Sequence, residues 1–348
     1  MTETPSAGTE PSLSVSTARK GAARSLIALA RPAGGTNGVL AIMILVLCAG
    51  FAAFLPHGSI GPGTLQSMMF QLPELALLSL AMSVAILSGG LNLAIIATAN
   101  ATALLMAVVV HALAPADGGT GGTLLAVLVA MGAGLCLAVA IGAVTGLLIA
   151  SLGLNPLLVT LGTMSLIGGL SVTLTRGGVI SGFPEMLLAL GNTSFFYVPV
   201  SFVLLLVVFG LVAALLSRTA FGISVRMLGS NPEATKFSGV SEVRALVGVY
   251  VLSSVLCWSA GLVMMARFNS ASAGYAGSYL LITILAAVLG GLNPYGGFGK
   301  IGGLLLGLVL LQLISTGFTL LGLDQHVTNV IWGVMLLVVM SARKMMSN

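Results

Sequence analysis

Residues 123–150 read TLLAVLVAMGAGLCLAVAIGAVTGLLIA, a run that contains no charged side chain. It is longer than the roughly 20 apolar residues that a helix needs to cross the hydrocarbon core of a bilayer. Its glycines, Gly132, Gly134, Gly142 and Gly146, are the small residues that let helix backbones approach closely in lipid. The run therefore predicts a membrane-spanning helix, and it sets the fold class.

Similar runs fill most of the chain, which is 57% hydrophobic, 6% charged and has a mean hydropathy of +1.14. Soluble domains carry about 25% charged residues. The runs are continuous and do not alternate with a period of two, which favours helices over a β-barrel. We expect an all-α polytopic membrane protein with about ten transmembrane helices. Their predicted positions are 38–55, 65–88, 92–112, 123–150, 156–175, 198–216, 245–266, 279–290, 301–318 and 328–341, the eighth being too short to span alone.

The charges predict the orientation. If both termini are cytoplasmic, the outer loops hold only Arg176 and Arg267 of the 13 lysines and arginines, as the positive-inside rule requires. Residues 1–35 lack the pattern of a signal peptide, so we expect a disordered cytoplasmic leader. A transmembrane domain then covers 36–345, with a cytoplasmic loop at about 217–244. This placement explains the net charge of +5 without a nucleic-acid partner.

No pattern of catalytic residues is visible. The nearest approach to a phosphate-binding loop, at 297–301, has Pro294 where the first glycine belongs and Ile301 where Ser or Thr belongs. The three cysteines lie singly in apolar runs and lack metal-ligand spacing. We therefore expect neither an enzyme nor a metal or cofactor site in this chain.

Glu74 is the clearest polar residue within a predicted span, and Gln71 and Pro73 lie beside it. Ionisable residues in a membrane face a packed interface or a water-filled path. Two interpretations stay open: a polar group on the substrate path, or an ion pair or hydrogen bond inside the bundle, with Arg267 or Arg176 as the partner. Pro73 frees backbone carbonyls and predicts a break in this helix.

Three further polar positions are candidates for a path. Asn92 ends the stretch 88–92, Ser-Gly-Gly-Leu-Asn, which is either a broken helix at a polar site or a tight turn. Asn100 follows on the next helix. Thr163 either lines a pore or bonds back to its own helix. Residues 290–293 repeat Gly-Gly-Leu-Asn, by internal duplication or by chance.

Several motifs in order resemble one family. They are Gly90-Leu91-Asn92-Leu93-Ala94, Pro156-Leu157-Leu158-Val159-Thr160-Leu161-Gly162-Thr163, Asn231-Pro232-Glu233-Ala234 and Ala286-Ala287-Val288-Leu289-Gly290-Gly291. From about residue 65 to 341 the chain resembles the ribose-type (monosaccharide) permease subunits of bacterial ABC importers. These belong to the larger group of branched-chain amino-acid and ribose permeases.

The resemblance implies a permease of the bacterial inner membrane that works as a dimer with a second copy or a paralogue. It also implies a separate cytoplasmic ABC ATPase, which would bind ATP and Mg²⁺, and a periplasmic solute-binding protein. The solute would be a monosaccharide or a similar small polar molecule. On this interpretation Glu74, Asn92, Asn100 and Thr163 are the predicted substrate path.

The stretch 231–239 resembles the EAA-x-x-x-G motif of importer coupling helices, with Thr235 in the place of the second alanine. Asn231 can cap a short helix, Pro232 fits its first turn, Glu233 suits its positive end and Gly239 ends it. Asn231, Pro232, Glu233, Ala234, Thr235 and Gly239 are therefore the predicted ATPase-coupling residues. The alternative is an ordinary amphipathic connector.

Two departures from the family bear on the substrate. Asn92 stands where the family has an aspartate, and Leu280 and Ile282 stand at two acidic positions. The solute therefore need not be ribose, and amino acids, nucleosides and polyols are rivals. The alternative function is an ion-coupled secondary carrier that uses Glu74 as its coupling carboxylate.

Overall fold

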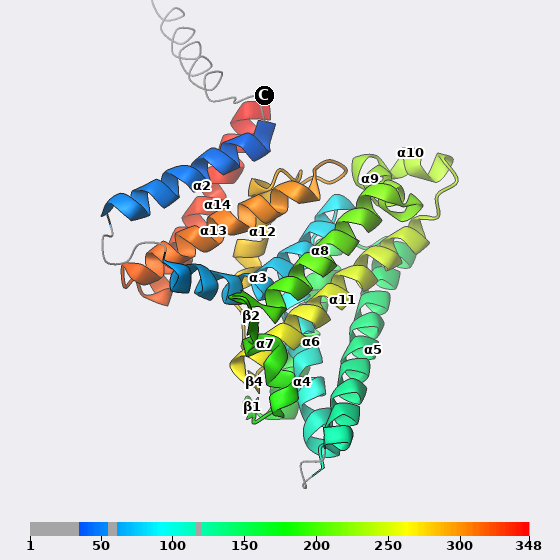
Figure 1. Cartoon of the computed structure of the whole chain (residues 1–348). Helices are drawn as coiled ribbons and strands as arrows, with labels where there is room; N and C mark the ends of the chain where they lie inside the picture. Colours follow the sequence, from blue (N-terminus) through cyan, green and yellow to red (C-terminus); the bar gives the residue numbers. More distant parts are fainter. Residues whose placement is uncertain (1–34, 55–60, 116–119, 348) are drawn as a thin grey trace, which may run out of the picture.

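The computed structural model describes residues 35–54, 61–115 and 120–347, and the predicted leader lies almost entirely outside them. The described chain is helical, with four two-residue strands (Figure 1). The helices are α2 (Gly35–Phe54), α3 (Pro62–Leu87), α4 (Ile95–Leu113), α5 (Thr120–Leu152), α6 (Pro156–Thr175), α7 (Glu185–Asn192), α8 (Val200–Arg218), α9 (Ala220–Ser230), α10 (Pro232–Phe237), α11 (Glu242–Phe268), α12 (Tyr279–Leu289), α13 (Ile301–Leu320) and α14 (Gln325–Ser347). The strands are β1 (Ile180–Ser181), β2 (Ser194–Phe195), β3 (Val198–Pro199) and β4 (Ser270–Ala271).

Helices occupy all ten predicted spans. Among the described residues, seven helices are long and apolar enough to cross a membrane: α3, α4, α5, α6, α8, α11 and α13. Shorter apolar helical stretches, at 37–49, 279–289 and 326–341, coincide with the other three. At 11 residues, α12 is about 16 Å long, roughly half the thickness of the hydrocarbon core. It is short, as predicted, and the all-α polytopic fold is confirmed.

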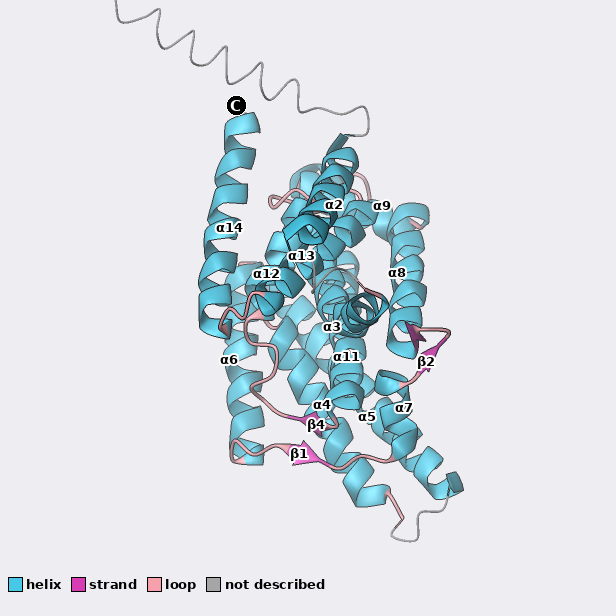
Figure 2. Cartoon of the chain, turned by 60° about the vertical axis from the view of Figure 1, so that its left-hand side comes forward, coloured by secondary structure: helices cyan, strands magenta, loops and turns pink. Residues whose placement is uncertain are grey.

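Two helices form the centre of the bundle. In its most apolar window, α3 is 89% buried and α11 is 67% buried, against 17% for α6. α3 packs against α8, α11, α12 and α13, and α11 also packs against α4, α5 and α7 (Figures 1 and 2). The other helices leave one apolar side outward, as lipid-facing helices do.

Glycines set the close approach of α5 to α11. A Cβ atom on Gly142 would lie 2.6 Å from the Tyr250 carbonyl oxygen, and one on Gly146 would lie 2.7 Å from the Val247 Cα. A Cβ atom on Gly132 would meet no described atom within 4 Å. The predicted role in close packing therefore holds for Gly142 and Gly146 but not for Gly132.

The break predicted at Pro73 is wrong. α3 continues from Pro62 to Leu87 with Pro73 inside it. The proline removes one N–H from the helix, but the buried side chains on both sides of it hold the helix in place.

The two ends of the bundle differ (Figure 1). At one, the β4 end, β1 pairs antiparallel with β4 and α7 lies beside them. At the other, the α10 end, α9 packs against α3, α8 and α11, and α10 packs against α9 and α11. α11 runs from one to the other. The strands, α7 and α9 have no counterpart among the predicted elements, because they are short; α9 lies within the predicted loop 217–244.

Candidate functional site

A buried ion pair joins three helices near the β4 end. The side chain of Glu74 in α3 is 1% exposed, and its Oε1 accepts hydrogen bonds from Arg267 Nη1 and Tyr279 Oη, each at 2.8 Å. Arg267 lies in the last turn of α11, and Tyr279 is the first residue of α12. The predicted ion pair with Arg267 is therefore confirmed. Arg176, the other candidate, is exposed at the end of α6.

The second carboxylate oxygen of Glu74 is unsatisfied. Its Oε2 is buried and has no hydrogen-bond partner among the described residues. Glu74 lines a cavity of about 430 Å³ whose wall is largely polar and aromatic. The lining residues are Glu74, Met264, Phe268, Ser270, Tyr275, Ala276, Ser278 and Tyr279.

Contacts among the lining residues order the wall. The hydroxyls of Ser270 and Tyr275 lie 2.7 Å apart. The ring of Tyr275 meets that of Phe268 edge-on at 5.5 Å, and the Arg267 guanidinium lies 5.0 Å from the centre of the Phe268 ring. The wall therefore combines hydroxyl groups with aromatic surface.

Asn100 supports this wall from outside the cavity. It is 2% exposed, and its Nδ2 donates to the carbonyl oxygens of Ala273 and Tyr275, each at 2.9 Å. The loop that carries Tyr275 is thus held against α4. Asn100 belongs to the surroundings of the cavity but is not part of its lining.

Asn92 lies far from the cavity, in the turn after α3. That helix ends at Leu87, roughly 20 Å along its axis from Glu74. Asn92 is 3% exposed, and its Nδ2 donates to Ser253 Oγ at 2.9 Å while Ser253 Oγ donates to the Ala81 carbonyl at 3.0 Å. The side chain ties α3 to α11, which fits the tight-turn interpretation.

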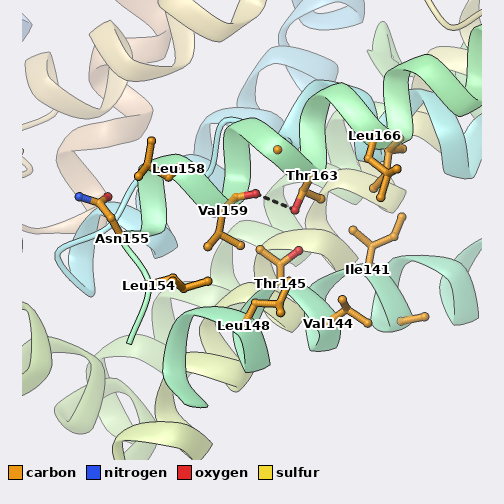
Figure 3. A pocket seen from close by; sticks show the side chains of 13 residues that line it. Ile141, Val144, Thr145, Leu148, Leu154, Asn155, Leu158, Val159, Thr163 and Leu166 are labelled. Atoms are coloured by element: carbon orange, nitrogen blue, oxygen red, sulfur yellow. Dashed lines mark hydrogen bonds between the residues drawn. The ribbon is translucent and has the colours of Figure 1, made fainter. Parts of the chain in front are cut away.

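Thr163 lies in a third place, an apolar groove of about 590 Å³ between α5 and α6 (Figure 3). Its Oγ1 donates to the Val159 carbonyl of its own helix at 2.9 Å. The four predicted path residues therefore do not converge. Glu74 lines the polar cavity, Asn100 supports it, and Asn92 and Thr163 lie elsewhere; their role in transport stays a prediction.

The helix predicted at 231–239 is present as α10. Asn231 Oδ1 accepts from the Ala234 N–H at 3.0 Å, which is the predicted cap. Pro232 is the first helical residue, and Glu233 lies in the first turn. Gly239 follows the helix with a φ of +75°, a left-handed conformation that favours glycine.

One residue anchors α10, and the others face outward. Thr235 is 1% exposed, and its Oγ1 donates to the Asn231 carbonyl at 2.7 Å. Lys236 pairs with Glu242 at 3.1 Å. Phe237 is 94% exposed. The threonine that replaces the family's alanine thus fixes the first turn, and the exposed Phe237 is a feature that the sequence motifs did not indicate.

Backbone contacts join α9 to two other segments. A Cβ atom on Gly229 would lie 2.1 Å from the Leu87 carbonyl oxygen and 2.4 Å from the Gly297 nitrogen. The Gly297 N–H donates to the same Leu87 carbonyl at 3.1 Å. Arg226 Nη1 donates to the Gly299 carbonyl at 2.9 Å. We call this contact the glycine junction; its glycines are Gly89, Gly229, Gly296 and Gly297.

The two Gly-Gly-Leu-Asn stretches end helices in the same way. Gly89 after α3 and Gly291 after α12 have φ values of +86° and +91°, and Gly90 and Leu292 each donate to a carbonyl five residues back. This is the Schellman cap. The left-handed residue is the first glycine of one stretch and the second of the other. The two stretches are therefore not equivalent position by position.

Comparison with known proteins agrees with these features. Residues 64–340 match the family described as "Branched-chain amino acid transport system / permease component". The chain is 29% identical over 279 residues to the Autoinducer 2 import system permease protein LsrD of Yersinia pseudotuberculosis serotype O:1b (strain IP 31758). The aligned region covers 77% of this chain and 79% of that protein.

It is also 34% identical over 197 residues to the L-arabinose transport system permease protein AraH of Escherichia coli (strain K12), covering 56% of this chain and 59% of that protein. No solved structure matches the chain. The family match spans most of the sequence and the same segments as the motifs quoted above, so the predicted resemblance is confirmed. The chain belongs to the branched-chain amino acid transport system permease family and is a multi-pass membrane permease.

Proposed function

We propose that this chain is the membrane-spanning subunit of a binding-protein-dependent ABC importer that moves a small polar solute across the bacterial inner membrane. The observation that carries the proposal is α10, a capped and largely exposed helix at one end of the bundle, in a chain that matches the permease family over residues 64–340. The two relatives, by their names, belong to an L-arabinose transport system and an autoinducer 2 import system.

The charges favour a cytoplasmic position for the α10 end. Five basic residues lie in or beside its loops: Arg218, Arg226, Lys236, Arg244 and Lys300. This follows the positive-inside rule. A cytoplasmic ABC ATPase would then meet α10, bind ATP and Mg²⁺ itself and supply the energy. A periplasmic binding protein would deliver the solute at the β4 end, and a second permease copy or paralogue would complete the pore.

Two exposed side chains of α10 suit docking to the ATPase. Phe237 presents an aromatic ring that nothing in the described chain covers, and such a residue gains most when a partner buries it. Glu233 lies at the N-terminal turn of the helix. Because Thr235 and the Asn231 cap hold α10 together, a closing ATPase would displace it as a rigid body.

The test is gentle purification of the tagged full chain from native membranes, with identification of bound proteins by mass spectrometry. We expect a P-loop ATPase in the sample, and we expect Glu233→Lys and Phe237→Ala to lose most of it. Matched controls are Glu185→Lys, in the first turn of α7 at the β4 end, and Phe196→Ala, whose ring is 93% exposed. Both should retain the ATPase.

The opposite result is equally clear. A chain that carries no ATPase and still transports its solute into liposomes on an ion gradient, without ATP, contradicts the importer. Glu74→Gln should then abolish uptake, because Glu74 would be the coupling carboxylate of a secondary carrier.

A further inference from the structure

We propose that the hairpin formed by β2 and β3 is an interfacial anchor, whose aromatic side chains insert into the headgroup region of the bilayer on the β4 side. We call residues 194–199 the aromatic hairpin. The inference is independent of the proposed function, since it requires only that the chain spans a bilayer. It concerns the end of the molecule opposite α10 (Figure 1).

The aromatic hairpin exposes three consecutive rings. Phe195 is 74% exposed, Phe196 is 93% exposed and Tyr197 is 72% exposed. The backbone beneath them is held in place, because β3 packs against α3 and α8 and the Val200 N–H donates to the Thr193 carbonyl at 3.0 Å. A contiguous apolar surface on a folded chain marks an interaction with a protein or a membrane.

The backbone of the turn makes aromatic residues an unfavourable choice for a turn in water. Phe195 pairs with Val198, so Phe196 and Tyr197 form a two-residue turn, and their φ values are +46° and +68°. A turn with two left-handed residues favours Asn-Gly. Bulky residues rarely adopt this conformation. The two rings therefore cost conformational free energy, which burial in a partner would offset.

The length of α8 places the aromatic hairpin at a membrane interface. α8 begins at Val200, directly after β3, and its 19 residues extend over about 28 Å. The hydrocarbon core is roughly 30 Å thick, so the two ends of this apolar helix lie close to the two boundaries of the core. The aromatic hairpin then lies at the level of the headgroups, where membrane proteins concentrate aromatic side chains.

The surroundings of the aromatic hairpin favour lipid as its occupant. It stands out sideways from the bundle beside the end of α8 (Figure 2). α8 is only 28% buried in its most apolar window and exposes Val203, Val207 and Leu211. No charged residue occurs from 186 to 217. The rings thus adjoin an uncharged helix with a lipid-facing side, and they offer no charge to a polar protein surface.

α7 connects the aromatic hairpin to the end of α11. A Cβ atom on Gly191 would lie 2.5 Å from the Ala266 carbonyl carbon, and Asn192 Nδ2 donates to the Ala266 carbonyl oxygen at 3.0 Å. The next residue is Arg267, the partner of Glu74. The anchor would therefore hold α7 and the end of α11 at a fixed depth in the bilayer.

The first experiment identifies what touches position 196. Phe196 is replaced in the full chain by p-benzoylphenylalanine, which crosslinks to neighbouring C–H bonds on irradiation. The chain is irradiated in native membranes and purified, and its adducts are identified by mass spectrometry. We expect a phospholipid adduct. The matched control carries the same replacement at Phe237, which is 94% exposed on α10, and should give no lipid adduct whether or not an ATPase covers it.

A second label guards against disturbance of the turn by the crosslinker. Phe196→Trp and Phe237→Trp are reconstituted in phosphatidylcholine vesicles, and the emission of the wild-type chain, which contains Trp258 and Trp332, is subtracted. We expect lipid brominated near the top of its acyl chains to quench Trp emission at position 196 and aqueous iodide to quench it weakly. The opposite pattern is expected at position 237.

The effect of the anchor is measured with Phe196→Asn combined with Tyr197→Gly. This variant has the favoured turn sequence and lacks two of the rings. If the rings hold α7 to the bilayer, amide hydrogen exchange over residues 185–192 becomes faster in vesicles. A hairpin with a structural role alone would be stabilised by the better turn, and exchange there would be unchanged or slower.

Three results would overturn the anchor. They are a protein adduct at position 196 in place of lipid, iodide quenching as strong at position 196 as at position 237, and unchanged or slower exchange in the Asn-Gly variant. A protein adduct from a second permease copy or a solute-binding protein would assign the rings to that partner. None of these results bears on capture of the ATPase at α10, so the importer is tested separately.

Discussion

The side chains of Glu74 and Tyr279 are hydrogen-bonded at 2.8 Å although 205 residues separate them in the sequence. The bond ties the middle of α3 to the first residue of α12. Arg267, at the end of α11, completes the cluster. One carboxylate of α3 therefore binds two helices from much later in the chain, α11 and α12, and changes to it should affect both stability and the cavity.

Removing one member of the Glu74–Arg267 ion pair should lower the free energy of unfolding more than removing both members. Arg267→Leu leaves the Glu74 charge buried without its cation, and we expect a loss of about 3 kcal/mol in the free energy of unfolding. Adding Glu74→Leu should restore much of that loss, because the uncompensated charge is gone. Thermal unfolding in detergent measures both. Arg176→Leu, at an exposed arginine, should change stability little; a double variant no more stable than Arg267→Leu would contradict the prediction.

Restoring the family's aspartate at position 92 should destabilise this chain. Asn92 Nδ2 donates to Ser253 Oγ, whose own proton goes to the Ala81 carbonyl. With aspartate at position 92, a carboxylate oxygen and the Ser253 Oγ would face each other as two acceptors with no proton between them, at a side chain that is only 3% exposed. We expect Asn92→Asp to lower the free energy of unfolding by about 1–3 kcal/mol. Asn155→Asp, at the exposed cap of α6, is the control and should be neutral, since aspartate caps helices equally well.

Asn100→Ala should loosen the loop that carries Tyr275. The change removes both hydrogen bonds to the carbonyls of Ala273 and Tyr275. We expect faster amide hydrogen exchange over residues 272–278, with the rest of the bundle unchanged. Asn192→Ala is the control, because its Nδ2 bonds to the Ala266 carbonyl instead. Unaltered exchange in 272–278 would show that the loop does not depend on Asn100.

Gly229→Ala should reduce uptake strongly, and Gly210→Ala should change it little. The new Cβ at position 229 would lie 2.1 Å from a backbone oxygen, so α9 must shift away from α3. Nothing lies within 4 Å of a Cβ at Gly210, in α8, where alanine favours the helix by up to about 1 kcal/mol. The measurement is ATP-driven uptake by the reconstituted importer, scaled to the amount folded. Equal uptake by the two variants would argue against the junction.

The parts of the structure that could be predicted depend on local signals. The apolar runs identified ten of the thirteen described helices, because length and hydropathy determine which segments can span. α10 was predictable residue by residue, since capping by Asn231 and termination at Gly239 involve neighbours in the chain. The pairing of Glu74 with Arg267 could be predicted because the predicted outer loops contain only one other cation, Arg176.

The cavity itself could not be predicted. Its lining comes from α3 and from residues 264–279, and no local pattern shows that these segments meet. Asn92 was assigned to the path from its place in the Ser-Gly-Gly-Leu-Asn stretch, Thr163 from its hydroxyl, and both from the family resemblance. Which way a polar side chain in a helix faces, and whether its own backbone or a neighbour satisfies it, depends on tertiary packing. The unpaired Oε2 is likewise visible only in three dimensions.

The glycine junction brings main chain against main chain, so its glycines have no side chain that could change rotamer to absorb a displacement. A movement of α9 must carry the end of α3 and the segment around Gly297 with it, or break the bond between Gly297 and Leu87. On the other side of α9, Thr219 joins it to α8 in an extended conformation, and a Cβ atom on Gly222 would lie 2.3 Å from the Leu216 carbonyl oxygen, so main chain meets main chain there as well. A displacement of α9 would therefore be passed to α3 on one side and to α8 on the other through main-chain contacts alone.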